Sequence, residues 1–149
     1  MDIKNKNGFT IVEVVVVLGI AGLLFMIVFL AVPQITQQRR NQNRQEDIAV
    51  LAEAIERHAI NNAGGTYPDA ASDVVNDLNF NDLDLVDPIS ETTYSPTSNL
   101  MPDVGEYGYA RNSGCGDNGI IDSTLGGGIL SYAVNIGLEG GGAVCSEGS

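Results

Sequence analysis

The first third of the chain holds one long apolar segment. Residues 14–32 read VVVVLGIAGLLFMIVFLAV, with no charged or strongly polar side chain. At 1.5 Å per residue, a helix of that length spans about 29 Å, close to the roughly 30 Å of bilayer hydrocarbon. A core helix of a soluble protein would show a polar face every three or four residues, and this segment shows none. The pattern therefore predicts a membrane-spanning helix.

The apolar segment is predicted to stay in the working protein. A secretory signal peptide has an apolar core of about 7–15 residues, followed by a small-x-small cleavage site. Here the core is longer, and the residues at its end, FLAVPQ, contain no such site. Removal of the segment by signal peptidase is therefore not expected.

The orientation of the segment rests on two opposing signals. Lys4 and Lys6 precede it, and three arginines follow it, Arg39, Arg40 and Arg44. The positive-inside count alone therefore favours a cytoplasmic C-terminal portion. The acidic charge and the two cysteines of that portion suit an exported location instead. On that basis we place the N-terminus in the cytoplasm.

Beyond the apolar segment, the helix is predicted to continue in amphipathic form. Pro33 lacks a backbone N–H, so it is predicted to kink or interrupt the helix. After a polar stretch, apolar residues recur at steps of three and four positions. They form one stripe, made of Ile48, Leu51, Ala52, Ile55 and Ala59.

The rest of the chain is rich in turns and only weakly periodic. A short helix is predicted over residues 69–78. Strands are predicted over residues 106–112, 119–123 and 129–136, the last with partial alternation of apolar and polar positions. The predicted fold class is α+β. A long N-terminal helix, half membrane-spanning and half amphipathic, packs on a small antiparallel β-sheet domain.

The charge of the chain is concentrated in its C-terminal portion. Residues 1–57 hold six basic and six acidic residues, whereas residues 58–149 hold thirteen acidic residues and one basic residue, Arg111, for a total of −12. Such a portion repels nucleic acid, which disfavours direct DNA binding. Since acidic residues follow closely, we interpret the three arginines at positions 39, 40 and 44 as solvated or paired between subunits. The alternative is a patch for lipid headgroups or nucleic acid.

The two cysteines, Cys115 and Cys145, do not form a C-x-x-C motif, and no histidine lies near them. A tetrahedral zinc site therefore lacks ligands. In an oxidising compartment a disulfide is expected, and the alternative is two buried free thiols. Closing a loop of roughly 30 residues would stabilise the fold by about 3–4 kcal/mol.

No motif of a known catalytic or phosphate-binding class is present. We therefore expect neither enzymatic activity nor a cofactor. Two groups of loop residues could offer oxygen ligands to calcium, but both lack the glycine and the distal glutamate of an EF-hand. We interpret them as solvated loop residues and expect no metal site. The groups are Asp82, Asp84 and Asp87, and Asp117, Asn118 and Asp122.

The first thirteen residues carry the most specific pattern. A short polar leader, MDIKNKNG, ends at Gly8, Phe9 opens the apolar stretch, and a single acid, Glu13, follows four residues later. This pattern resembles the class III signal of type IV prepilins and type II secretion pseudopilins. The resemblance implies that a prepilin peptidase in the membrane cuts between Gly8 and Phe9 and methylates the new amine of Phe9.

The resemblance also implies a role for Glu13. An ionised carboxylate in apolar surroundings costs several kcal/mol unless it is paired. In the family, this acid meets the N-terminal amine of a neighbouring subunit and sets the subunit register. The alternative is that Glu13 marks the interfacial end of a membrane helix. Gly19 and Gly22, within the apolar segment, would allow close approach of helices or local flexibility.

Four segments follow from the resemblance and the patterns together. They are a leader over residues 1–8, a transmembrane and filament-core helix over 9–33, its amphipathic half over 34–63, and an acidic, β-rich globular part over 64–149. The precursor is expected in the cytoplasmic membrane, and the mature protein in an extracellular pilus on the cell surface.

Three hypotheses for the function follow. The first is a structural subunit of a type IV pilus, serving adhesion, twitching motility or uptake. Its expected partners are further copies in a helical filament, the prepilin peptidase, the assembly platform in the cytoplasmic membrane, and lipid before assembly. The second is a pseudopilin of a type II secretion or DNA-uptake system. The third is a single-pass anchor for an exported binding domain, whose N-terminus would stay intact.

Overall fold

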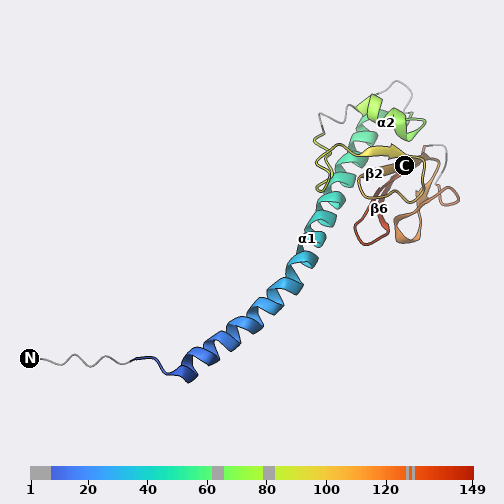
Figure 1. Cartoon of the computed structure of the whole chain (residues 1–149). Helices are drawn as coiled ribbons and strands as arrows, with labels where there is room; N and C mark the ends of the chain where they lie inside the picture. The colour runs from blue at the N-terminus through green and yellow to red at the C-terminus, as the bar shows by residue number, and fades with distance from the viewer. Residues whose placement is uncertain (1–7, 62–65, 79–82, 127, 129) are drawn as a thin grey trace, which may run out of the picture. The chain divides into compact units, whose positions relative to one another are not determined.

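The computed structural model describes residues 8–61, 66–78, 83–126, 128 and 130–149. The chain forms two compact units, Met1–Gln38 and Arg39–Ser149, which we call the stem unit and the head unit. One helix, α1 (Ile11–Asn61), runs through both (Figure 1). The fold is α+β: a long apolar N-terminal helix whose later half packs on a small sheet.

Helix α1 is continuous through Pro33. The proline removes one backbone donor from the helix. Close to it, the Thr36 hydroxyl donates a hydrogen bond to the Val32 carbonyl, at 2.9 Å. The predicted interruption of the helix is therefore wrong, whereas a kink within continuous helix stays a prediction. The predicted end of the helix at residue 63 lies outside the described residues.

In the head unit, α1 buries the stripe that the periodicity predicts. Ile48, Leu51, Ala52, Ile55 and Ala59 are all buried. All of them except Ala59 pack with residues of the sheet and of a second helix in one apolar cluster. Burying a Leu or Ile side chain stabilises a fold by about 1.5–3 kcal/mol, so this stripe is the main attachment of α1 to the head.

The main sheet has four strands in the order β1-β2-β5-β6. Strands β2, β5 and β6 are antiparallel neighbours, whereas β1 runs parallel to β2. The sheet is therefore mixed, with its antiparallel part as predicted. The strands are β1 (Ser95–Thr97), β2 (Glu106–Arg111), β5 (Tyr132–Gly137) and β6 (Ala143–Gly148).

Two smaller elements complete the head. Helix α2 (Ala71–Leu78) lies within its predicted range, and the Asp73 carboxylate caps it by accepting a hydrogen bond from the Ala70 N–H at 3.1 Å. Strands β3 (Gly114–Cys115) and β4 (Ile121–Asp122) form a two-stranded sheet.

The predicted strand over residues 119–123 shortens to β4. A 3-10 turn (Asp117–Gly119) precedes it, with Asn118 in the left-handed region at φ 59°. The predicted strand over residues 129–136 begins only at Tyr132, and Ile129 lies outside the described residues.

Buried tyrosines attach the sheet to α1 and to the segment before α2. The Tyr132 hydroxyl donates a hydrogen bond to the Ala52 carbonyl of α1 at 2.9 Å, and the Tyr109 hydroxyl donates to the Pro68 carbonyl at 2.8 Å. A buried phenol is costly unless its hydroxyl finds a partner. The Tyr132 bond therefore helps to fix which face of α1 meets the sheet, and the Tyr109 bond holds the segment before α2 against it.

Candidate processing and assembly site

Helix α1 begins directly after Thr10, which caps it. The Thr10 Oγ1 accepts a hydrogen bond from the Glu13 N–H at 3.3 Å, and the Thr10 hydroxyl lies 3.5 Å from Glu13 Oε2. The spacing Thr-x-x-Glu is that of a capping box, and the bond to Thr10 Oγ1 satisfies one of the backbone donors that the first helical turn leaves open. Glu13 thus has a local role at the helix start, which the sequence analysis does not identify.

The junction between Gly8 and Phe9 lies outside the helix. Gly8, Phe9 and Thr10 have no regular secondary structure, and the Phe9 side chain is 85% exposed. A side chain added at Gly8 would meet no atom within 4 Å. The peptide bond between Gly8 and Phe9 is therefore open to an enzyme that approaches the helix start.

Among residues 8–38, the stem unit exposes all of its large apolar side chains. From Ile11 to Ile35 their exposed fractions lie between 49% and 83%. The helix is long and apolar enough to cross a membrane, and the mean hydropathy of its most apolar stretch is 3.1. An apolar surface of this size is not stable in water. It needs lipid or further apolar helices around it.

Glu13 is the one charged residue among residues 8–38 of the stem unit, because this range contains no other acid and no Lys, Arg or His. Its side chain borders a shallow groove together with four apolar neighbours, Phe9, Val14, Val17 and Leu18. A carboxylate in such surroundings costs several kcal/mol unless a cation pairs with it. The range itself supplies no side-chain cation for that purpose.

Residues 3–29 match the family model of the prokaryotic N-terminal methylation motif. This motif is the class III leader found in precursors of type IV pilins and pseudopilins. The match includes the junction, Glu13, and both glycines of the apolar segment, and it ends before Pro33. No curated protein and no solved structure matches the chain.

For a prepilin-type chain, the motif implies processing by a prepilin peptidase and assembly into pilus-like polymers. The leader and the apolar helix fit a membrane-anchored precursor that is exported to the surface. Gly19 and Gly22 lie three positions apart in α1, and a side chain added at either would meet no atom within 4 Å. Close approach of another helix there stays a prediction.

In the head unit, two of the three arginines form a charge cluster with Asn41, Asp87 and Glu139. Arg44 is fully buried, and its Nε and Nη2 donate to Asp87 Oδ2 at 2.9 and 2.7 Å. Its Nη1 donates to Glu139 Oε1 at 3.1 Å. Arg40 donates to both carboxylate oxygens of Glu139, at 2.5 and 2.6 Å.

The charge cluster corrects two interpretations from the sequence. Arg44 is not solvated, because it is fully buried, and the ion pairs that Arg40 and Arg44 form lie within one head unit rather than between subunits. Arg39 is exposed. Asp87 is not a solvated loop residue, because it is 1% exposed and its Oδ1 accepts hydrogen bonds from the N–H groups of Ile89 and Ser90, at 2.9 and 3.0 Å. A buried carboxylate needs such partners.

The same contacts lower the pKa of both carboxyl groups. For Glu139, the hydrogen bond from Arg40 and then that from Arg44 outweigh burial and hold the pKa at about 2. For Asp87, burial raises the pKa, but the Ser90 N–H, Arg44 and the Ile89 N–H together lower it below its ordinary value. Both groups are therefore held in the ionised form in the folded head.

The stability of the head is expected to fall in acid. Glu139 and Asp87 have lower pKa values folded than unfolded, so their contribution is fully present above about pH 4 to 5, where unfolded carboxyl groups ionise. It is lost as the pH falls from there towards 2. Thermal unfolding of the protein at pH 7, 4 and 2.5 checks this, and Glu139→Gln should flatten the dependence. An unfolding midpoint that is no lower at pH 2.5 would contradict it.

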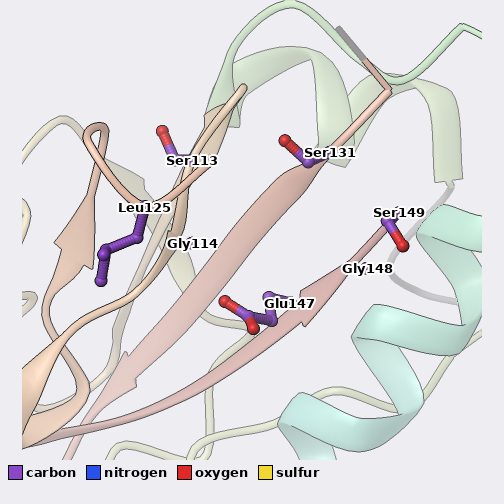
Figure 2. Close-up of a pocket in the computed structure, with 7 residues that line it drawn as sticks. All are labelled: Ser113, Gly114, Leu125, Ser131, Glu147, Gly148 and Ser149. Atoms are coloured by element: carbon purple, nitrogen blue, oxygen red, sulfur yellow. The ribbon is translucent and has the colours of Figure 1, made fainter. Parts of the chain in front are cut away.

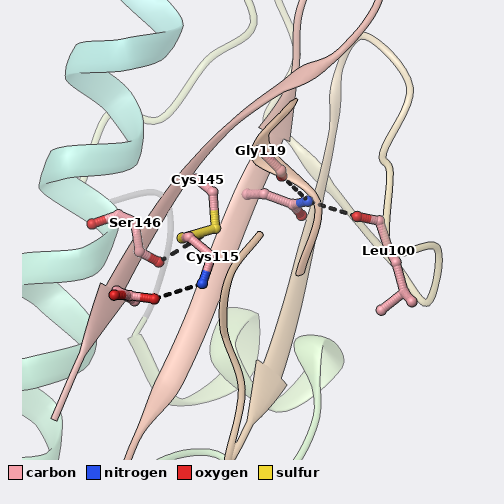
Figure 3. Close-up of a disulfide and its surroundings, with 7 residues drawn as sticks. Leu100, Cys115, Gly119, Cys145 and Ser146 are labelled. Carbon is pink, nitrogen blue, oxygen red and sulfur yellow. Dashed lines mark hydrogen bonds between the residues drawn. A yellow bond between two sulfur atoms is a disulfide. The ribbon is translucent and has the colours of Figure 1, made fainter. Parts of the chain in front are cut away.

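The predicted disulfide is present. Cys115 on β3 and Cys145 on β6 are bonded, with 5.8 Å between their Cα atoms and 30 positions between them in the chain (Figure 3). The Cys115 N–H donates to Glu147 Oε2 at 2.5 Å. For a loop of this length the chain-entropy model gives a stabilisation of about 3–4 kcal/mol.

A cavity of about 300 Å³ is lined by residues of β3, of β6 and of the loops around them (Figure 2). Glu147 borders it together with the hydroxyl-bearing residues Ser113 and Ser131. Both hydroxyls already donate within the chain, Ser113 to the Arg111 carbonyl and Ser131 to the Gly128 carbonyl. Since Glu147 is also engaged with Cys115, these groups serve the local fold.

Asn135, in the centre of β5, is a buried polar residue that the sequence analysis does not identify. Its Nδ2 donates to the carbonyls of Leu100 and Gly119, at 2.8 and 2.9 Å, and so fixes two loops to the sheet (Figure 3). Gly108 pairs with it on β2, and a side chain there would collide with Asn135 Oδ1. Neither residue stands out in the sequence, because the pairing of Gly108 with Asn135 joins two strands that are far apart in the chain.

Neither group of loop acids gathers into a metal site within the described part of the chain, where no three His, Cys, Asp or Glu side chains are grouped suitably. Asp122 is engaged in its own turn, because its Oδ1 accepts from the Thr124 N–H at 2.7 Å. Asp87 belongs to the charge cluster, and Asp82 lies outside the described residues.

Proposed function

We propose that the chain is a structural subunit of a type IV pilus. The precursor is cleaved between Gly8 and Phe9, methylated at Phe9, and polymerised through the apolar part of α1. One observation carries the proposal. The methylation motif coincides with an exposed apolar helix that, over residues 11–38, bears a single carboxylate and no side-chain cation.

Cleavage explains how Glu13 obtains its cation. The leader carries the only two lysines of the chain, Lys4 and Lys6, and both leave with it. In residues 9–38 of the mature chain, the new ammonium group of Phe9 is then the one positive charge. Pairing Glu13 of one copy with the Phe9 ammonium of an adjoining copy neutralises both charges inside the bundle, at a fixed axial offset. The pairing also makes assembly depend on prior cleavage.

The four proposed segments then have distinct tasks. Residues 1–8 keep the precursor from assembling, and residues 9–33 anchor it in the membrane and later form the filament core. Residues 34–63 connect this core to residues 64–149, which form the surface of the filament. The disulfide and the acidic charge support an exported position for that surface.

Mass spectrometry of the protein purified from its native filaments or membranes tests this function. The expected mature chain begins at Phe9 and carries one added methyl group. A Gly8→Val change is expected to retain the leader, because a small residue is needed at the cut. The control Ala31→Val, which introduces the same residue within α1 and away from the junction, should leave processing intact. An assembled protein that still begins at Met1 would refute the proposal and favour a membrane-anchored binding domain.

A further inference from the structure

A cleft in the head unit is separate from the apolar helix and from the charge cluster. It lies between the start of α2, strand β1 and the end of β2, and its volume is about 530 Å³. Small-molecule sites in proteins have volumes of about 300–1,000 Å³. Its lining combines hydroxyl-bearing and apolar residues, among them Ser72, Thr97, Ser98, Pro96 and Leu100, with one cation, Arg111, and one acid, Asp69.

Arg111 is the only Lys or Arg in residues 58–149, which otherwise carry thirteen acids. One of its guanidinium nitrogens, Nη1, pairs with Asp69. Its Nε is buried and has no hydrogen-bond partner among the described residues. A guanidinium offers five N–H donors, and a buried donor without an acceptor is costly. The buried Nε is out of reach of a ligand, but Arg111 lines the cleft and its side chain is 27% exposed, so the outer N–H groups of its guanidinium can bind an anion there.

The partner of Arg111 is easily displaced. The Asp69 side chain is 83% exposed, whereas that of Arg111 is 27% exposed. An ion pair in which one side chain is largely exposed contributes little to stability, because water solvates that carboxylate almost as well when it is unpaired. A carboxylate from outside can take the place of Asp69 at the same nitrogen without leaving a buried charge behind.

We propose that this cleft binds a small carboxylate of the sugar-acid class. The planar guanidinium matches a carboxylate group. The hydroxyls of Ser72, Thr97 and Ser98 provide donors and acceptors for ligand hydroxyls, and Pro96 and Leu100 provide an apolar wall for the C–H face of a sugar ring. The site lies wholly in the head unit. It requires neither cleavage nor polymerisation, so it can fail without the proposed function failing.

Saturation-transfer NMR on the full chain tests the proposal. The protein is held in a polyoxyethylene detergent, which contains no sugar, and titrated with D-glucuronate, D-glucose or acetate at constant ionic strength. D-Glucuronate is expected to bind in the millimolar range and more tightly than the other two. Arg111→Gln should weaken binding about tenfold or more, since the loss of hydrogen bonds to a charged group typically lowers affinity by that factor. Asp69→Asn should strengthen it roughly two- to fivefold by removing the internal competitor.

The two variants are expected to change D-glucuronate binding in opposite directions. A general effect on the fold would weaken binding in both, so the pair distinguishes the two explanations. Thermal unfolding of both variants verifies that the head is intact, and if Arg111→Gln unfolds, the Asp69→Asn result decides alone. Equal binding of D-glucose and D-glucuronate, or unchanged D-glucuronate binding in Asp69→Asn, would overturn the proposal. Acetate binding as tight as D-glucuronate would reject the sugar-acid class.

Discussion

Replacing Glu13 with alanine is expected to abolish filaments while the protein stays in the membrane. In the variant, the Phe9 ammonium of each copy would enter an apolar bundle without a counter-charge, at a cost of several kcal/mol per subunit. That cost recurs at every contact along a filament, so the loss should be near complete. Electron microscopy of cell surfaces measures filament number and length, and membrane fractionation measures the retained protein.

Two further variants separate the charge of Glu13 from its part in the capping box with Thr10. Glu13→Gln removes the charge, but glutamine also serves at this capping-box position, so we expect no filaments from it either. Thr10→Ala removes the cap and should cost about 1 kcal/mol of helix stability. It should reduce filaments only modestly. Filaments of normal number and length from Glu13→Gln would show that the carboxylate does not set the register.

Replacing Arg44 with methionine is expected to lower the free energy of unfolding of the head by about 3–5 kcal/mol. The change leaves Asp87 buried without its cation and removes one of the two arginines that contact Glu139. Whole domains are stable by only about 5–15 kcal/mol, so the loss takes a large share of the total. Chemical unfolding of the full chain in detergent, followed by a signal from the head, measures it.

Arg39→Met is the matched control for Arg44→Met. It removes the same group from an exposed position on the same helix, five residues earlier, and surface changes of this kind are usually within about 0.5 kcal/mol of neutral. An Asp87→Asn change, alone and combined with Arg44→Met, measures the coupling of the buried pair. If Arg44→Met were no more destabilising than Arg39→Met, the charge cluster would not hold the head together.

The elements that depend on local pattern could be predicted from the sequence. The apolar segment, the buried stripe of α1, helix α2 and strand β2 all follow from residues close together in the chain. Strands β1 and β6 could not be predicted in this way. Pro96 in β1 argues against a strand, and it is tolerated because β1 is short and lies at the edge of the sheet. Strand β6 reads AVCSEG, without alternation, and its place is set by pairing with β5.

The candidate site divides in the same way. The junction at Gly8 and the acid at Glu13 could be found because the motif is contiguous. The charge cluster could not, because Arg44 and Asp87 are 43 positions apart and Arg40 and Glu139 are 99 positions apart. Over such distances, no periodicity indicates which acid meets which base. A local pair such as Glu53 and Arg57, four positions apart on α1, is predictable and present.

The charge cluster also determines how a soluble fragment of this protein should be designed. The head unit begins at Arg39, well inside α1, and its first turns supply Arg40, Asn41 and Arg44. A truncation that removes the apolar segment and resumes at Arg39 retains every partner of Glu139 and Asp87. A fragment that begins after Arg44 would instead leave the Asp87 carboxylate buried without a cation. We expect such a fragment to fold poorly although its sheet is complete.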